Sequence, residues 1–275
     1  MKKNIVVATD FSQRSFDVIN KAFVFAKKSN SVVHVVHIIE KSFFEKVKDE
    51  NSVYENSFTH IKEKIPTLLK ENFHCRQDSL SDGIERYVKE LNAYMVIIGS
   101  NGDRNSILRE FLGTNTKSIV RAIDVPCLIL KSNKKNLDFD SILMPTDLSK
   151  ASKSYLDKIH SLFPHSKIEL LYSYVVPFEG KLSFYGMDKS ESISFQENMK
   201  DLALDEVYKF YNSLEVDKNK VKVSVIKEGL SPEAFSLNAD NKNCDMIALH
   251  TTGNFSFFAF DLLEHSHKDV IISKI

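Results

Sequence analysis

The sequence predicts an α/β protein made of two doubly wound parallel sheets in tandem. Residues 5–12 (IVVATDFS) are echoed by residues 142–149 (ILMPTDLS) at a constant offset of 137, which is an internal repeat of domain length. Short apolar runs rich in β-branched residues also alternate with segments whose apolar residues recur at helical spacing. At 275 residues the chain is long enough for two domains, each with its own core.

Strands and helices alternate along the first half. Strands are expected at residues 5–8, 31–39, 74–79, 95–98 and 127–130, and helices at 16–26, 53–69, 82–91 and 114–122. Asp10 and Ser12 are candidate caps of the first helix. The run 95–98 is continuously apolar, as expected of a strand buried on both faces of a parallel sheet. Cys127 lies in the last apolar run, so we expect it in the core.

The second half repeats this order. Matching strands are expected at residues 142–144, 168–176, 221–226, 246–249 and 270–273, and Leu156 and Ile159 mark its first helix. The short polar segment 131–138 is a linker, which predicts domains at 1–133 and 139–275. Repeated halves on a short linker predict an approximate twofold relation, with the edge strands 127–130 and 270–273 as candidates for the seam. An insertion at 177–196 forms a lid, a partner surface or a mobile loop.

Composition narrows the class of protein. The 37 basic side chains balance 37 acidic ones, so no global field attracts nucleic acid or an anionic membrane. The three cysteines are far apart and odd in number, unlike a zinc motif or a disulfide scaffold. No apolar run approaches the roughly 20 residues of a membrane span. We therefore expect a cytoplasmic protein with no nucleic-acid or membrane partner.

A candidate ligand site lies where the first and fourth strands of the first half end. In an open parallel sheet, ligands bind outside the carboxyl ends of the strands at the switch point. Asp10 and Gly99 end those two strands, and Gly102 lets the backbone approach a ligand closely. Gly113 and Thr114 begin a helix whose free N–H groups and hydroxyl suit a phosphate. Glycines also favour ordinary turns after strands, so this pattern alone leaves a purely structural role open.

The same segments resemble the universal stress protein family. The resemblance rests on IVVATDFS, the strand end HII at His37, MVIIGSNG and GTNTKSIVRAIDVPCLIL, and it extends to the second half as in tandem members of the family. It implies five parallel strands per domain in a Rossmann-like sheet of the adenine nucleotide α hydrolase type. One branch of the family binds ATP through Gly, two residues, Gly, nine residues, Gly and Ser or Thr. Here ten residues separate Gly102 from Gly113.

The resemblance assigns a nucleotide site to the first half. The residues that it implies are Thr9 and Asp10 at adenosine, Ile38 at adenine, and Gly99, Gly102, Gly113, Thr114 and Asn115 at ribose and phosphates. The ligand would be ATP, or AMP or ADP, with no metal beyond the magnesium that accompanies a nucleotide. Arg104 and Arg109 could neutralise phosphate, and a solvated helix face explains them equally well.

The second half departs from this pattern. Thr146 and Asp147 persist, but His250 replaces the first glycine and Gly253 stands alone. Residues 254–260 hold four phenylalanines where a phosphate loop would lie, which predicts core or a domain interface rather than the wall of an apolar pocket. An imidazole at the end of the fourth strand would fill the space of the ribose. We therefore predict at most one nucleotide per chain.

Catalytic and metal sites find little support in the sequence. His34 and His37 lie three apart on a strand and so face opposite sides. His250, His265 and His267 lack the defined spacing of a zinc site. No nucleophile or general base stands out, so slow ATP hydrolysis or self-phosphorylation would rest on fold analogy alone.

Two functions from different classes therefore remain. The first is a stress-response sensor or regulator that binds an adenine nucleotide in the first domain of an intramolecular pseudo-dimer, with a homodimer left open. The alternative is an interaction or scaffold protein that binds a partner or an apolar ligand through its second domain.

Overall fold

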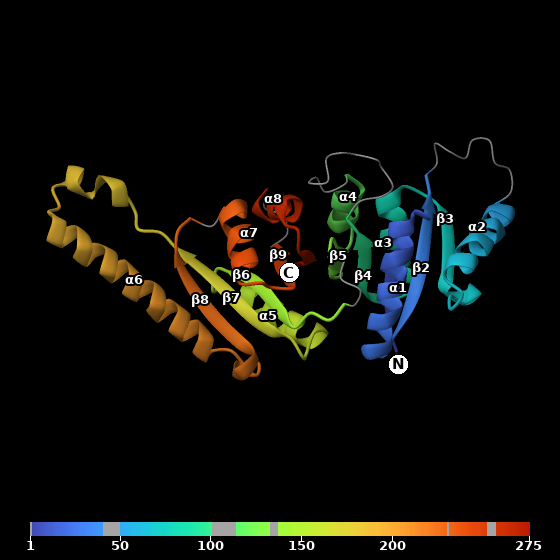
Figure 1. The fold of residues 1–275 in the computed structure, drawn as a ribbon, viewed down its shortest axis with the longest axis horizontal. Helices are drawn as coiled ribbons and strands as arrows, with labels where there is room; N and C mark the ends of the chain where they lie inside the picture. Colours follow the sequence, from blue (N-terminus) through green and yellow to red (C-terminus); the bar gives the residue numbers. More distant parts are fainter. Residues whose placement is uncertain (1, 41–49, 101–113, 133–136, 230, 252–256) are drawn as a thin grey trace. The chain divides into compact units, whose positions relative to one another are not determined.

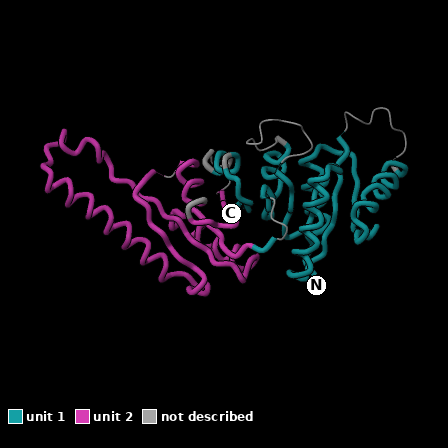
Figure 2. Tube along the Cα trace, in the orientation of Figure 1, with its two compact units in different colours: residues 1–138, 253–274 teal, residues 139–252, 275 magenta. Residues whose placement is uncertain are grey.

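The computed structural model describes residues 2–40, 50–100, 114–132, 137–229, 231–251 and 257–275 (Figure 1). They form two compact units (Figure 2). The first unit comprises residues 1–138 with 253–274, and the second comprises 139–252 with residue 275. By its contacts, the end of the second half thus belongs to the first unit. The sequence-based domain ranges, 1–133 and 139–275, stay a prediction.

The first unit contains a doubly wound sheet. Its elements are β1 (Lys3–Ala8), α1 (Gln13–Lys28), β2 (Ser31–Ile39), α2 (Glu50–Lys64), β3 (Phe73–Gln77), α3 (Leu80–Glu90), β4 (Ala93–Gly99), α4 (Thr114–Ala122), β5 (Cys127–Leu130), α8 (Phe257–His265) and β10 (Asp269–Lys274). The strands lie in the order β3-β2-β1-β4-β5-β10, and the first five are parallel. Right-handed crossovers place α1 and α2 on one face and α3 and α4 on the other. Cys127 is buried in the core, as expected.

Two of the boundaries that differ from the sequence-based expectation have a local cause. Helix α2 ends at Lys64 rather than Leu69, because Pro66 disfavours helical backbone in the preceding residue. Helix α3 begins at Leu80 instead of Asp82, because the Ser79 side chain accepts the backbone N–H of Asp82 at 3.3 Å and caps the helix.

Strand β10 completes the sheet of the first unit from the far end of the chain. It pairs antiparallel with β5, with Val270 opposite Ile129 and Ile272 opposite Cys127. This pairing joins the two strands that the sequence analysis proposed for the seam. Asp269, which is 1% exposed, anchors the pair at its start.

Asp269 and Lys131 form hydrogen bonds that connect the end of β5 to the start of β10 and to the end of α8. One Asp269 carboxylate oxygen accepts the backbone N–H groups of Lys131 and Ser132, both at 2.7 Å, and the other accepts the Ser132 hydroxyl at 2.8 Å. The Lys131 ammonium donates to the carbonyls of Leu263 and Ser266 at the end of α8. Burial lowers the pKa of Lys131 to about 8, against the opposing attraction of Asp269. A buried charged network therefore holds α8 and β10 to the first unit.

The second unit repeats the fold with four parallel strands. Its elements are β6 (Ser141–Thr146), α5 (Lys150–Leu162), β7 (Lys167–Tyr174), η3 (Glu179–Tyr185), α6 (Lys189–Asn212), β8 (Val221–Lys227), α7 (Pro232–Asn241) and β9 (Met246–Thr251). The order is β9-β6-β7-β8. The predicted insertion, 177–196, is the short helix η3 and the beginning of α6. Both halves of the sequence thus supply α/β units dominated by parallel strands, which confirms the predicted fold class. None of the described helices is long and apolar enough to cross a membrane.

A pair of histidines bridges β2 and β3 of the first unit. His34 Nδ1 lies 3.0 Å from His74 Nε2, and the His74 ring lies 5.3 Å from the Tyr87 ring. Burial and the neighbouring His34 lower the pKa of His74 to about 4, and the charges of Arg76 and Glu90 act on it in opposite directions. Burial also lowers the pKa of His34. The pair is therefore neutral in the folded protein at neutral pH.

This pair predicts that stability falls as the pH drops from about 6.5 toward 4. The unfolded chain takes up protons on His74 near pH 6.5, whereas the folded chain resists until about pH 4. Partial solvent exposure of the ring limits the loss to roughly 1–2 kcal/mol. Urea unfolding at pH 7 and pH 5 should show a smaller pH difference for His74→Gln than for the wild type. Equal differences in the two proteins would contradict the assignment.

Candidate functional site

The turn after β1 has an unusual backbone that the second unit repeats. Phe11 has φ 61°, and Leu148, at the same position of the second unit, has φ 59°. Non-glycine residues rarely adopt this conformation, which is often found at functional sites. The Phe11 N–H donates to Thr9 Oγ1 at 3.1 Å, and the Ser12 N–H donates to Asp10 Oδ1 at 3.0 Å. These bonds hold the turn and direct the Asp10 side chain to the carboxyl end of the sheet.

In the second unit the same bonds recur. The Leu148 N–H donates to Thr146 Oγ1 and the Ser149 N–H to Asp147 Oδ1, both at 3.0 Å. The repeat seen in the sequence is therefore also a repeat of hydrogen bonds.

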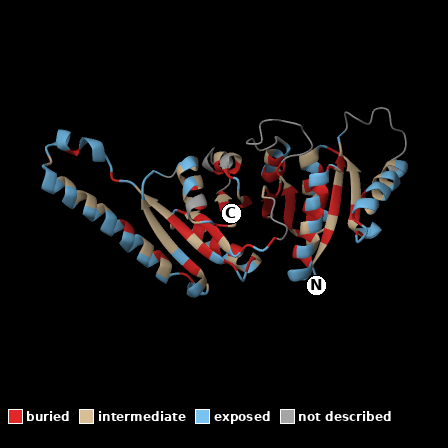
Figure 3. Cartoon of the chain, in the orientation of Figure 1, coloured by how far each residue is buried: buried red, intermediate tan, exposed pale blue. Residues whose placement is uncertain are grey.

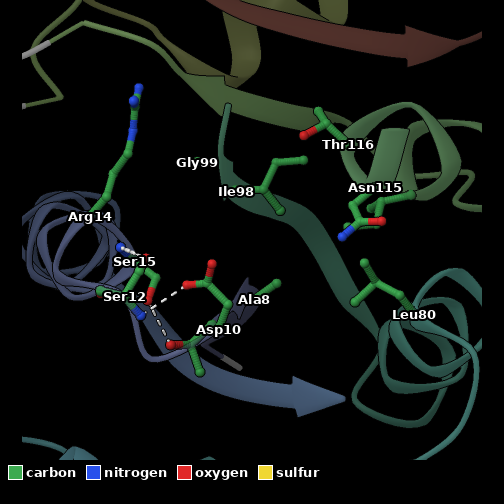
Figure 4. A pocket seen from close by; sticks show the side chains of 12 residues that line it. Ala8, Asp10, Ser12, Arg14, Ser15, Leu80, Ile98, Gly99, Asn115 and Thr116 are labelled. Atoms are coloured by element: carbon green, nitrogen blue, oxygen red, sulfur yellow. Dashed lines mark hydrogen bonds between the residues drawn. The ribbon is translucent and has the colours of Figure 1, made fainter. Parts of the chain in front are cut away.

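A cleft of the first unit opens beside this turn. It has a cavity volume of about 110 Å³ and lies between the carboxyl ends of β1 and β4, where the strand order reverses. Its lining residues are Ala8, Thr9, Asp10, Ser12, Arg14, Ser15, Leu80, Ile98, Gly99, Asn115, Thr116 and Ile119. In Figure 4, Asp10 and Ser12 lie on one side and Asn115 and Thr116 on the other. This volume holds several water molecules, or one part of a larger ligand.

Acidic and basic groups meet in this cleft. Burial acts to raise the pKa of Asp10, but hydrogen bonds from Ser12 and Ser15 outweigh it, so the pKa lies below its ordinary value. Asp10 is therefore a carboxylate at neutral pH and a hydrogen-bond acceptor. The Arg14 guanidinium donates to Ser100 Oγ at 2.8 Å and to the Lys131 carbonyl at 3.3 Å. It adds a permanent positive charge to the rim.

Helix α4 contributes its first turn. Asn115 and Thr116 line the cleft, and the Thr116 hydroxyl donates to the Ser100 carbonyl at 3.3 Å. The first amide groups of a helix lack partners within the helix, and the helix dipole adds partial positive charge there. This end of the cleft therefore suits an anionic group.

The structure brings together four of the predicted site residues. Thr9, Asp10, Gly99 and Asn115 line the cleft. Ile38 does not: its side chain is 7% exposed and packs under α3, where a Cβ added to Gly83 would come within 2.6 Å of it. Thr114 begins α4. Gly102 and Gly113 lie outside the described residues, as do Arg104 and Arg109.

Arg14 is the principal lining residue that the sequence analysis missed. It lies on an exposed helical turn, where a charged residue has no pattern to separate it from a solvated surface. Its position in the sequence could have indicated this role. Arg14 lies two residues after the Ser12 cap, and the first turn of a helix that follows β1 faces the switch point.

In the second unit, the corresponding polar groups bond to one another. The Ser152 hydroxyl donates to Asp147 Oδ1 at 2.7 Å, and Ser152 Oγ lies 3.0 Å from His250 Nε2. Strand registers make His250 the equivalent of Gly99, since Val6 pairs with Val96 and Leu143 with Ile247. Burial lowers the pKa of His250, against the charge of Asp147. A neutral imidazole thus stands where the first unit has a glycine.

The histidines of the first half have structural partners. His37 Nδ1 lies 2.9 Å from the Thr9 carbonyl, and His34 faces His74, which agrees with the prediction that His34 and His37 point to opposite sides. Among the described residues, no group of three or more His, Cys, Asp or Glu side chains could hold a metal ion.

The fold and the cleft together define a class: doubly wound α/β proteins with a cleft at the switch point between β1 and β4. The family model described as "Universal stress protein family" matches residues 1–131. Universal stress protein G of Escherichia coli O157:H7 is 24% identical over 144 residues, which cover 48% of this chain and all of that protein. Over residues 1–131, the chain thus matches the universal stress protein family.

Solved structures extend the likeness of fold to the whole chain. A functionally unknown protein from Pseudomonas aeruginosa PAO1 is 12% identical with a TM-score of 0.66, and the match covers 99% of this chain and 92% of that one. A universal stress protein from Archaeoglobus fulgidus DSM 4304 is 16% identical with a TM-score of 0.61, covering 98% and 96%. At these identities the likeness shows the fold alone.

Proposed function

We propose that the first unit binds an adenine nucleotide, with ATP as the leading ligand, and that the protein acts as a stress-response sensor or regulator. The observation that carries the proposal is the cleft at the switch point, where the Asp10 carboxylate faces the first turn of α4. Asp10 would accept hydrogen bonds from the ribose hydroxyls or the adenine amino group. Arg14 and the first amides of α4 would hold phosphate oxygens.

The residues present fit a nucleotide by their chemistry. Apolar side chains, Leu80, Ile98 and Ile119, line the same cleft and offer contact to a base or sugar. Polar groups at its ends supply both an acceptor and a cation. A nucleotide would bring its own magnesium ion, and nothing in the proposal requires a protein ligand for it.

Titration of the full chain with ATP tests the proposal. Calorimetry with Mg-ATP should give one site per chain, since the second unit has His250 at the position of Gly99. Asp10→Ala should weaken binding by about one to two decades, or about 1 to 3 kcal/mol, through loss of a polar anchor.

Asp147→Ala is the matched control because Asp147 makes the same turn bond in the second unit. It should leave ATP affinity unchanged. No heat of binding with the folded wild type, two equivalent sites, or equal effects of the two variants would each contradict the assignment.

A second candidate function is interaction through the second unit. It is favoured by large apolar side chains exposed on and around α6, such as Phe184 at 85% and Tyr208 at 68%. A wild-type chain without affinity for ATP, AMP or ADP would favour this function.

A further inference from the structure

We infer that the second unit carries a surface for a second copy of this chain, formed by the free edge of β8 and one stripe of α6. Both elements belong to the same unit, and Figure 1 shows α6 running beside β8. We call this surface the β8–α6 edge. It is defined by residues Leu204, Val207, Tyr208, Tyr211 and 221–227. The inference is independent of nucleotide binding in the first unit.

The first observation is a helix with two apolar stripes. Ala203 and Phe210 are buried and pack α6 on the sheet, as does Leu214 just after the helix. Leu204, Tyr208 and Tyr211 follow at spacings of four and three residues and form a second stripe beside the first. Leu204 and Tyr208 are 42% and 68% exposed. Much of α6 lies exposed, as Figure 3 shows.

The second observation is an open sheet edge beside that stripe. β8 pairs with β7 and ends the strand order of the second unit. Alternate backbone groups of an edge strand point outward without a ladder partner, which makes the edge a template for another strand. The second stripe of α6 and the first residues of β8, Val221 to Val223, line a groove of about 420 Å³. The groove therefore lies next to the edge at which an added strand would pair.

The third observation identifies the added strand as a second β8. An antiparallel pair centred on Ser224 overlaps over all seven residues of β8. In this register Val223 lies opposite Val225, and Lys222 opposite Ile226. Lys227 lies opposite Val221, so the pair places no two lysines opposite each other. The strand can therefore pair with a second copy of itself without placing like charges opposite each other.

The two faces of β8 agree with this arrangement. Lys227 donates to Gln196 of α6 at 3.0 Å, whereas Ser224 bonds to Glu169, which also pairs with Lys242 beyond α7. Odd-numbered residues of β8 thus face α6 and even-numbered residues face the other side. A twofold axis perpendicular to the sheet places the odd-numbered residues of β8 from both copies on the same face. It brings Val225 of the copy beside the groove, and places the Leu204–Tyr208–Tyr211 stripes of both copies side by side on one face.

Sedimentation equilibrium of the full chain tests this surface. The wild type should be a dimer. Tyr208→Glu should raise the dimer dissociation constant at least about 100-fold, because each dimer loses the residue twice and gains two buried charges. Leu237→Glu is the matched control, since Leu237 is exposed to a similar extent, 62%, on α7. It should leave the dimer intact.

Crosslinking tests the register separately. Ser224→Cys, in a Cys75→Ser background, should give a covalent dimer with a short bifunctional thiol reagent, whereas Ser231→Cys should not. A wild type that remains monomeric would overturn the inference and point to a partner of another kind. A dimer that persists in Tyr208→Glu, or that does not crosslink through position 224, would overturn it too.

Discussion

Replacing Gly99 by histidine is expected to abolish nucleotide binding to the first unit, with a loss of at least about 100-fold in affinity, or about 2.7 kcal/mol. The substitution copies the second unit, where His250 holds the equivalent position in its strand. There the imidazole lies 5.3 Å from the ring of Tyr155 and 3.0 Å from Ser152 Oγ. In the first unit Val18 replaces Tyr155, so an imidazole at position 99 would turn into the cleft.

Gly99→Ala separates this effect from damage to the fold. Within the described part of the chain, a Cβ at position 99 meets only Val18 Cγ2, at 3.5 Å, which is ordinary van der Waals contact. The alanine variant should therefore fold normally and keep ATP binding within a few-fold of the wild type, as measured by calorimetry. If Gly99→His retained affinity, the cleft between β1 and β4 would not be the nucleotide site.

Asp269→Ala is expected to lower the free energy of unfolding by about 3 to 5 kcal/mol. The substitution leaves two backbone N–H groups and the Ser132 hydroxyl without the carboxylate that they now share. It also removes the negative charge that faces the buried ammonium of Lys131. The junction between β5 and β10 should therefore open more easily.

Denaturant unfolding measures this loss, and Asp124→Ala provides the comparison. Asp124 pairs with Lys274 at the other end of β10, at 3.1 Å, with a side chain that is 76% exposed. An exposed pair contributes about 0–1 kcal/mol. Similar small losses in both variants would show that the Asp269 network does not hold the junction.

Much of the fold followed from local patterns in the sequence. The bounds expected for α4 and β5 equal the observed ones. Apolar spacing defines the helix and the strand, and Val125–Pro126 separates them. The predicted end of α2 was wrong because Pro66 disfavours helical backbone at Ile65 and so ends the helix at Lys64. The repeat indicated that the strands at 127–130 and 270–273 meet, but local sequence could not reveal that α8 and β10 group with the first unit, which depends on contacts between residues about 140 positions apart.

The candidate site was predictable where it uses backbone turns and glycines. Thr9, Asp10, Gly99 and Asn115 line the cleft because they end strands or begin a helix at the switch point. Ile38, which the resemblance places at adenine, packs under α3 and does not line the cleft, so its contact with adenine stays a prediction. Arg14 lines the cleft through the reach of its side chain to Ser100 and Lys131, for which its place two residues after the Ser12 cap was the available local signal.

The place of β10 has a consequence for how such a gene can change. Because β10 covers the edge of β5, a stop codon after the first repeat would leave that strand bare and expose an aggregation-prone edge. Selection against such an exposed edge therefore acts to retain the last strand of the second repeat. The residues around His250 could then change while β10 continued to cover the edge of β5.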